Sequence, residues 1–344
     1  MVTEQGATSA RLKRVPKGAI LLAMYGATVG RLGVLGIEAT TNQAICHIVP
    51  DDTRVDRGYL YHAIAAQVPH LISKGVGGAQ PNISQGTVRS LRIPLPSLPE
   101  QRRIAALLDK ADALIAKRQR AIAMLDELAQ AVFLEMFGDP VTNEKGWEAV
   151  ALHDVCTIAG QYGANVSAEP YDAEKPRYVR ITDVDENGRL NGDTKSPAGA
   201  AANWTKYILS PGDFLFARSG ATVGKTYMHH EDAPAAVFAG YMIRFRLDPE
   251  RCLPSFLFQL TKTRFYRDWV STRSRTVAQP NINAKQYGTE LIFPLPPVEI
   301  QRVFEGRIRA FEATRRRMIS EAGTVLSVTL RARCFPEHQT SEVA

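Results

Sequence analysis

The chain repeats itself at a period of roughly 200 residues, far longer than the unit of a solenoid. Three short motifs define the repeat and keep the same order in both copies. They are Gly26–Arg31 and Gly220–Lys225 (GATVGR and GATVGK), Ala79–Ser84 and Ala278–Asn283 (AQPNIS and AQPNIN), and Pro94–Pro96 and Pro294–Pro296, each Pro-Leu-Pro being followed by Gln-Arg at 101–102 and 301–302. The repeat therefore predicts two related domains that share one fold.

The segments between the motifs also correspond. Each copy is predicted to contain a Gly-led apolar strand, further alternating strands, an amphipathic helix and a last short strand. In chain order these are Ala19–Ala23, Gln43–Val49, Gly58–Ser73 and Leu91–Pro94 in the first copy, and Asp213–Ala217, Val237–Leu247, Pro254–Thr272 and Leu291–Pro294 in the second. The mixture of strands and helices predicts an α+β fold.

A long helix is predicted after each Pro-Leu-Pro. The first spans Pro99–Phe137, and Gly138-Asp139-Pro140 ends it. Apolar residues at alternating steps of three and four predict a heptad seam, which needs a partner helix. The seam positions are Ile104, Leu108, Ala111, Ile115, Ile122, Leu125, Ala129 and Val132 in the first helix, and Ile300, Phe304, Ile308, Phe311, Met318, Ala322 and Val325 in the second. Either the two helices pair with each other or each packs separately on its own domain.

The two copies differ at their N-terminal sides. In the second copy a long segment from Gly146-Trp147 precedes the strand that starts after Gly212, whereas only residues 1–17 precede the equivalent Gly18. The first domain is therefore expected to be N-terminally truncated, either genuinely or through a misassigned start.

The charge balance favours a polyanionic partner. The chain has 42 basic and 35 acidic residues, a net charge of +7 and a pI of about 9.2. One segment, residues 261–285, concentrates this excess, with a single acid, Asp268. Its basic residues are Lys262, Arg264, Arg267, Arg273, Arg275 and Lys285, and it also contains Phe265, Tyr266 and Trp269. Such a segment can neutralise phosphates, or it is an ordinary solvated helix face.

The repeated loops supply the other candidate DNA contacts. Gln80, Asn82, Gln279 and Asn281 carry amides, which pair bidentately with adenine edges. Because this loop is nearly the same in both copies, it serves either as a structural turn or as a backbone contact. The Gly-Ala-Thr-Val-Gly loop, with Thr28, Arg31, Thr222 and Lys225, has the same ambiguity. Neighbouring positions that differ between the copies are the better candidates for base readout: Met24, Tyr25, Arg218 and Ser219.

No catalytic centre is predicted. Ser219–Thr226 resembles a phosphate-binding loop but is one residue short, and neither a nucleophile elbow nor a Rossmann fingerprint is present. Cys46, Cys156, Cys252 and Cys334 lie far apart, so neither a disulfide framework nor a zinc site is expected. The cluster His229–Asp232 is interpreted as a polar turn, and no metal is expected. Since no signal peptide or apolar span is recognised, the protein is expected in the cytoplasm.

Several ordered segments resemble one family. Pro94–Pro96 with Glu100–Ile104, and Phe133–Pro140 leading to Gly146-Trp147, resemble the entry and exit of the central helix of type I restriction-modification specificity subunits. Tyr178–Asp183, Gly212–Leu215, Ser219–Gly224 and Gln279–Ile282 are similar to motifs of that family's target-recognition domains. The resemblance covers essentially the whole chain.

The resemblance implies two α/β-type target-recognition domains separated by two long antiparallel helices, with a pseudo-two-fold repeat. It places the parts at residues 1–96 (first recognition domain), 97–139 (central helix), 140–296 (second recognition domain), 297–335 (C-terminal helix) and 336–344 (tail). Each domain would read one half of an asymmetric double-stranded DNA target, and the helices would set the spacer. The short first domain departs from the family pattern and puts its half-site in doubt.

The resemblance also implies partners. The helices would dock modification (methyltransferase) subunits, two per chain, and a restriction subunit where one is present. S-adenosylmethionine, ATP and Mg would be bound by those subunits, and no cofactor by this chain. Two other classes compete with this non-catalytic reader: a coiled-coil scaffold with no role on DNA, and an enzyme that methylates or cuts DNA itself. Salt-dependent DNA binding argues against the scaffold, and binding of S-adenosylmethionine by the chain alone would favour the enzyme.

Overall fold

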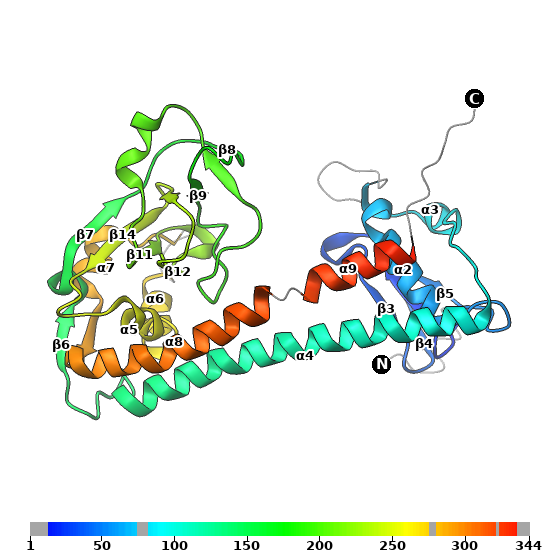
Figure 1. The fold of residues 1–344 in the computed structure, drawn as a ribbon, viewed down its shortest axis with the longest axis horizontal. Helices are drawn as coiled ribbons and strands as arrows, with labels where there is room; N and C mark the ends of the chain where they lie inside the picture. The colour runs from blue at the N-terminus through cyan, green and yellow to red at the C-terminus, as the bar shows by residue number, and fades with distance from the viewer. Residues whose placement is uncertain (1–12, 74–81, 275–279, 321–322, 336–344) are drawn as a thin grey trace. The chain divides into compact units, whose positions relative to one another are not determined.

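The computed structural model describes residues 13–73, 82–274, 280–320 and 323–335 (Figure 1). The chain forms two compact units. Unit 1 comprises Met1–Ile122 with Arg317–Ala344, and unit 2 comprises Ala123–Arg316. The helix α4, Leu98–Phe137, contributes residues to both. It confirms the long helix predicted over Pro99–Phe137, and Gly138 ends it with a left-handed φ of 79°.

Unit 2 is built on an antiparallel sheet with the strand order β12-β11-β14-β7. These strands are β7 (Cys156–Tyr162), β11 (Asp213–Ala217), β12 (Thr226–Met228) and β14 (Met242–Leu247). All five residues of β11 are buried. Phe214 and Phe216 pack there with Phe245 and Tyr287, so the Gly-led apolar strand predicted at Asp213–Ala217 is the centre of this core.

Shorter pairs of strands complete unit 2. β6 (Glu148–Ala151) pairs with β15 (Ile292–Leu295), β8 (Ala168–Pro170) with β10 (Lys195–Pro197), and β9 (Arg177–Val179) runs parallel to β13 (Ala236–Phe238). The helices are α5 (Pro254–Leu260), α6 (Arg264–Ser274) and α7 (Ala284–Glu290). Single-turn 3-10 helices lie at η2 (Leu152–Val155), η3 (Ala201–Asn203), η4 (Thr205–Tyr207) and η5 (Gly220–Thr222).

The prediction of a single helix over Pro254–Thr272 is wrong, because the structure has two helices there, α5 and α6. The break falls at Thr261 and Thr263, whose hydroxyls donate to the carbonyls of Phe258 (2.8 Å) and Leu260 (2.6 Å). Such side-chain bonds compete with the helical ladder. Thr261 also hydrogen-bonds Thr226 of β12 at 3.0 Å, which fixes the break against the sheet.

Unit 1 repeats part of this plan. Its sheet has the order β3-β2-β5, and a further pair joins β1 to β4. The elements are β1 (Arg14–Val15), β2 (Ile20–Ala23), η1 (Gly26–Thr28), β3 (Leu32–Val34), β4 (Ala39–Thr40), β5 (Ile45–Ile48), α2 (Arg57–Ser73) and α3 (Gln85–Arg89). The first apolar strand and the helix predicted at Gly58–Ser73 are both confirmed.

The strand predicted at Leu91–Pro94 is wrong. Its counterpart in unit 2, β15, is a strand because it pairs with β6. Within the described residues of unit 1, no strand pairs with Leu91–Pro94. A strand requires a hydrogen-bonded neighbour, so the same sequence pattern yields an extended segment here.

The repeat extends to individual backbone hydrogen bonds. In unit 1, the Gly30 N–H donates to Ala23 and the Ala23 N–H to Arg31, at 2.8 and 2.9 Å. In unit 2, the equivalent bonds run from Gly224 to Ala217 and from Ala217 to Lys225, at 3.0 and 2.8 Å. Gly30 and Gly224 have φ of 80° and 83°. A Cβ on Gly224 would lie 2.6 Å from Val270, so both geometry and packing require glycine.

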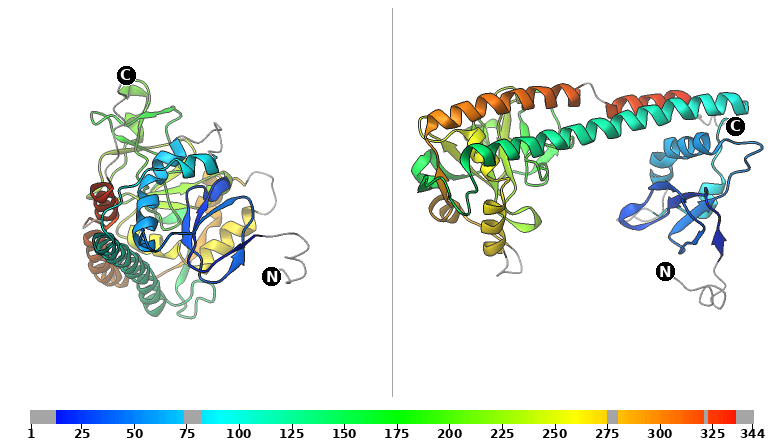
Figure 2. Two further views of the ribbon diagram at one scale, coloured as in Figure 1. Left: turned by 90° about the vertical axis from the view of Figure 1, so that its right-hand side faces the viewer. Right: turned by 90° about the horizontal axis from the view of Figure 1, so that it is seen from below.

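The helix predicted from Ile300 to Val325 is present as two helices, α8 (Val298–Ser320) and α9 (Gly323–Cys334). Glu321 and Ala322 lie outside the described residues. In unit 2, α8 runs antiparallel along the C-terminal part of α4, since Phe137 contacts Phe304 while Asp126 pairs with Arg315 (Figures 1 and 2). In unit 1, α9 runs antiparallel to the N-terminal part of α4, because Leu108 clusters with Phe335 and Asp112 pairs with Arg331.

The predicted seam residues face the interior of these helix pairs. Leu108, Phe304 and Ile308 are buried. Ala111 and Ala129 are buried as well. Eight further seam positions are half-buried: Ile104, Ile115, Ile122, Leu125, Val132, Ile300, Phe311 and Met318. In unit 2 the seam also joins the domain core. There the ring centroid of Phe133 lies 5.5 Å from that of Phe256 in α5 and 5.8 Å from that of Phe304 in α8. Both arrangements considered for the helices are thus present together.

A buried glutamine fastens each long helix to its domain. Gln301, at the start of α8, accepts from the Leu253 N–H (2.8 Å) and donates to the carbonyls of Arg251 (3.1 Å) and Pro296 (2.7 Å). At the start of α4, Gln101 accepts from Asp56 (2.8 Å) and donates to Arg54 (3.1 Å) and Pro96 (2.8 Å). Both side chains are fully buried. The Pro-Leu-Pro and Gln-Arg motifs therefore act together, because the glutamine joins the start of the helix to the Pro-Leu-Pro segment and to the preceding domain.

We expect Gln301→Leu to lower the free energy of unfolding of unit 2 by about 2–4 kcal/mol, because the backbone groups of Arg251, Leu253 and Pro296 lose the buried side chain that hydrogen-bonds them. All three tryptophans, Trp147, Trp204 and Trp269, lie in unit 2, so tryptophan fluorescence during urea unfolding reports on this unit.

Arg302→Gln is the matched control for this measurement. Arg302 pairs with Glu250 at the surface and should contribute less than about 1 kcal/mol. Equal transitions for wild type, Gln301→Leu and Arg302→Gln would show that the glutamine does not hold the helix.

Candidate nucleic-acid interface

The two repeated loops lie side by side in unit 2. Ser219 forms a β-bridge with Asn281, the Gly220 N–H donates to Pro280 at 3.0 Å, and the Ile282 N–H donates to Arg218 at 2.8 Å. In unit 1, the Ile83 N–H donates to Met24 at 2.7 Å in the same way. Loops some 60 residues apart in sequence therefore lie together in unit 2, and the described part of unit 1 repeats one of the bonds that join them.

The last residues of the Gln-Pro-Asn motif have structural roles. Ile83 and Ile282 are buried, and Ser84 and Asn283 cap α3 and α7 by accepting from backbone N–H groups three residues on. The amides of Asn82 and Asn281 are exposed and available to a partner. Gln80, Arg275 and Gln279 lie outside the described residues.

The glycine loop is a tight 3-10 turn in both copies. Gly26, Gly220 and the glycines that follow have left-handed φ values, and the Thr222 hydroxyl donates to the Ser219 carbonyl at 3.2 Å. Thr28 and Arg31 are exposed in unit 1. In unit 2, Lys225 is half-buried and turns inward, pairing with Glu186 at 2.9 Å and donating to the Val184 carbonyl at 3.2 Å.

The four positions singled out for base readout have different environments. Met24 is 6% exposed and belongs to a cluster with Leu22, Leu71 and Ile83, so its side chain faces the core of unit 1. Tyr25, next to it, is 36% exposed. In unit 2, Arg218 and Ser219 are half-buried.

Arg218 lies over an aromatic ring that sequence reasoning missed. Its guanidinium carbon is 4.8 Å from the centroid of Tyr162, which is 40% exposed, and its backbone N–H donates to Tyr241, which is 62% exposed. An arginine and two accessible tyrosines thus gather beside the paired loops of unit 2. Tyr162 ends β7, a strand without a counterpart among the described residues of unit 1, so comparison of the two copies could not reveal it.

The basic segment is partly neutralised by its own neighbours. Arg264 pairs with Asp268 at 3.1 Å, and Arg273 pairs with Glu290 at 3.1 Å while its guanidinium lies 4.1 Å from the centroid of Trp269. Arg267 and Lys285 are exposed. Among the described residues no carboxylate pairs with either, so α6 and α7 present these two cations to a partner.

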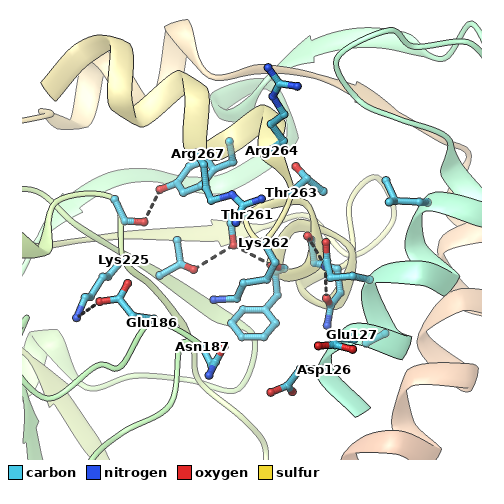
Figure 3. A pocket seen from close by; sticks show the side chains of 18 of the residues that line it. Asp126, Glu127, Glu186, Asn187, Lys225, Thr261, Lys262, Thr263, Arg264 and Arg267 are labelled. Atoms are coloured by element: carbon cyan, nitrogen blue, oxygen red, sulfur yellow. Dashed lines mark hydrogen bonds and ion pairs between the residues drawn. The ribbon is translucent and has the colours of Figure 1, made fainter. Parts of the chain in front are cut away.

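Lys262 lies in a cleft of about 1200 Å³ in unit 2 (Figure 3). Its ammonium is 4.5 Å from the centroid of Phe258, and burial lowers the pKa of Lys262 to about 8. Asp126, Glu127 and Glu186 also line the cleft. The cleft therefore mixes both charges and differs from the single-sign groove that suits a phosphate backbone.

Asp126 also connects the turn Asp185–Arg189 to the α4–α8 helix pair. It forms ion pairs with Arg189 and, at 3.6 Å, with Arg315 of α8. Arg189 belongs to the turn Asp185–Arg189, which is closed by hydrogen bonds from the Gly188 and Arg189 N–H groups to Asp185. The α4–α8 pair and this turn are held together by charge as well as by apolar packing.

The described residues lack several features of other protein classes. They contain no group of three or more His, Cys, Asp or Glu side chains able to hold a metal ion, and no helix of the described part is long and apolar enough to cross a membrane. The four cysteines are free thiols, and burial raises the pKa of Cys156 to about 12.

The family model for the type I restriction modification DNA specificity domain matches residues 2–124 and 144–316. These two matches coincide with the two copies of the repeat. The chain belongs to this family of DNA specificity domains.

Two relatives come from Methanocaldococcus jannaschii. The specificity subunit of the type I restriction enzyme MjaIX is 28% identical over 239 residues, covering 64% of this chain and 55% of that subunit. The specificity subunit of MjaVIII is 23% identical over 311 residues, covering 85% and 72%. The chain thus spans about half the length of the first relative and about seven tenths of the second.

A solved structure shows the same fold. The S subunit of a type I restriction-modification system from M. genitalium superposes with a TM-score of 0.55 at 15% identity, over 95% of this chain and 84% of that one. The two-domain α+β architecture expected from the sequence is therefore confirmed.

We expect Lys262→Met to stabilise unit 2 by on the order of 2 kcal/mol at pH 7, because the folded state then no longer desolvates a charge. The lowered pKa means that the unfolded chain binds this proton more tightly. The wild type therefore gains stability as the pH rises from about 8 towards 10.5, and the difference from Lys262→Met narrows over that range.

Urea unfolding followed by tryptophan fluorescence at pH 7.5 and pH 10 measures this difference, and other titrating groups cancel between the two proteins. A stability difference that is the same at both pH values would contradict a desolvated Lys262.

Proposed function

We propose that the chain is the DNA-reading subunit of a type I restriction-modification complex and that each unit reads one half of a split, asymmetric target. The observation that carries this proposal is that the two units share the same backbone hydrogen bonds around the repeated loops but carry different side chains there. We call these shared bonds the backbone frame. Arg218 and Met24 occupy the same hydrogen-bonded position in the two units but differ in chemistry and exposure. Two readers on one chain escape the palindrome that a homodimer imposes.

Phosphate contacts would come from the exposed cations beside the loops. Arg31 in unit 1 and Arg267 and Lys285 in unit 2 are exposed and have no carboxylate partner among the described residues. Such side chains set the position of a protein on DNA without reading its sequence. Binding is therefore expected to weaken steeply with salt, which is the property that separates this proposal from a scaffold.

The long helix α4 would dock the modification subunits through apolar residues that its own partners leave uncovered. Leu107 and Leu114 in unit 1 and Leu128 in unit 2 are 44–45% exposed and are spaced at multiples of seven residues. A heptad spacing is what a further helix needs for packing. These leucines differ from the seam positions predicted from the sequence, which face the chain's own interior.

The chemistry of the complex would then reside in its other subunits. The modification subunits would bind S-adenosylmethionine and methylate adenine, and a restriction subunit would use ATP and Mg. The chain itself would contribute recognition and assembly. Retention of S-adenosylmethionine by the purified chain alone would favour a catalytic role instead.

Co-expression with the cognate modification subunit, followed by single-molecule mapping of methylated adenines, tests the DNA-reading role. A split asymmetric motif is the expected result. A stable complex that methylates no defined motif would contradict recognition by this chain.

The docking role is tested with Leu114→Glu. A carboxylate placed in an apolar helix contact should weaken co-purification of the modification subunit by at least about tenfold.

Ala113→Glu introduces the same charge at the neighbouring exposed position on another face of α4, and it should leave the complex intact. Equal recovery of the modification subunit with both variants would place the docking surface elsewhere.

A further inference from the structure

We propose that Arg218, whose guanidinium lies on the ring of Tyr162, reads a guanine in the half-site recognised by unit 2. The inference rests on the proposed function and specifies the base that this site takes. It is carried by four features: a fixed backbone, a fixed aromatic platform, unsatisfied donors, and the replacement of this residue in the other unit.

The backbone of Arg218 is held from two sides. Its N–H donates to Tyr241 at 3.1 Å, and its carbonyl accepts from Ile282 at 2.8 Å. It directly follows β11, the buried central strand of the sheet. The Cα of Arg218 is therefore set by the sheet on one side and by the repeated loop on the other.

The platform beneath the side chain is also fixed. The guanidinium carbon lies 4.8 Å from the centroid of Tyr162, within the range of a cation–π contact. The Tyr162 hydroxyl accepts from the Ala284 N–H at 3.1 Å, which anchors the ring at the start of α7. Stacking restricts the rotamers of the arginine before DNA arrives, so less conformational entropy is lost on binding.

The guanidinium has donors to offer. The Arg218 Nε is buried without a hydrogen-bond partner, and no carboxylate pairs with the side chain among the described residues. Arg264 and Arg273, in contrast, are each occupied by an acid. With Nε buried, the two Nη groups are the donors left for a partner, and neither has a hydrogen bond among the described residues.

The same frame in unit 1 holds different side chains. The Met24 N–H donates to Ala44 at 2.8 Å, and its carbonyl accepts from Ile83 at 2.7 Å. Met24 thus occupies the position of Arg218, and Ala44 that of Tyr241. Residues that the frame requires recur, as Gly30 and Gly224 do. This position changes from a buried methionine to a half-buried arginine over an unchanged frame, so it is where the two half-sites can differ.

Chemistry selects the base. An arginine presented end-on donates two parallel hydrogen bonds, and in the major groove the O6 and N7 atoms of guanine are the acceptors that match them. A phosphate would accept the same donors without distinguishing sequence. Discrimination at one base pair therefore separates guanine reading from phosphate neutralisation.

The test uses the complex assembled with the modification subunit and Arg218→Met, which the Met24 frame shows to be compatible with this backbone. Once the wild-type motif is mapped, binding is measured to duplexes altered at each base pair in turn. We expect Arg218→Met to lose discrimination at one G·C pair by roughly 5- to 150-fold. The other half-site should be read as in the wild type.

Two further variants separate the roles of charge and geometry. Arg218→Lys keeps the charge but not the fork, so it should retain overall binding and lose discrimination at the same pair. Arg267→Met removes an exposed cation of α6 and should weaken binding to all duplexes alike without changing the motif.

An unchanged motif in Arg218→Met, or full discrimination in Arg218→Lys, would overturn the guanine assignment while leaving the DNA-reading role intact. Equal weakening on every duplex by Arg218→Met would make the residue a phosphate contact and overturn it likewise. A wild-type complex with no defined motif would overturn the proposed function and this inference together.

Discussion

The buried side chains of Gln101 and Gln301 attach the long helices to the strands and loops of units 1 and 2. Each amide bonds three backbone groups, one in its own Pro-Leu-Pro segment and two in the domain that precedes it. A buried amide with all of these bonds is favourable, and it becomes costly when any partner moves. The direction in which each helix leaves its domain is therefore set by hydrogen bonds of well-defined geometry as well as by apolar packing. In unit 2, the cluster of Phe133, Phe137, Phe256 and Phe304 extends the same junction into the core.

A repeated frame allows the two units to have different specificities at little structural cost. The tight glycine loop, the capped helix that follows the Gln-Pro-Asn motif and the glutamine junction recur with nearly equal hydrogen-bond lengths. Side chains beside this frame are free to change because the backbone does not depend on them. Arg218 and Met24 show how far this goes, since one reaches an accessible aromatic cluster and the other fills the core. Specificity in this account resides in few positions, and stability resides in the motifs that repeat.

The sequence predicted the repeat, the long helix and its end, and the apolar strands, because each rests on local rules of periodicity and of glycine geometry. It did not predict the break between α5 and α6, which depends on the contact of Thr261 with Thr226 of a distant strand. It predicted a strand at Leu91–Pro94, since a pattern cannot show whether a pairing neighbour exists.

The candidate interface was predicted only in part. The basic segment was identified by composition, but the ion pair of Arg273 with Glu290 is a tertiary contact. Together with the Arg264–Asp268 pair within α6, it leaves Arg267 as the one cation of α6 without a carboxylate partner among the described residues. The partner seam of α4 was read from spacing, which marks the apolar positions but not the side of the helix that the chain covers itself. Tyr162 and Tyr241 were not predicted as site residues because neither lies in a repeated motif. Their exposure and their position beside Arg218 emerge only from the fold.

We propose that each copy of the repeat reads one half-site independently through its own side chains. The most direct measurement is a methylated-adenine map from cells that carry the modification subunit and a chain in which residues 140–296 also replace residues 1–96. With identical readers at both positions, the account predicts that the split asymmetric target becomes a symmetric one with two copies of the unit 2 half-site. Retention of the original asymmetric motif would rule out independent reading, because the half-site would then not follow the unit that is present.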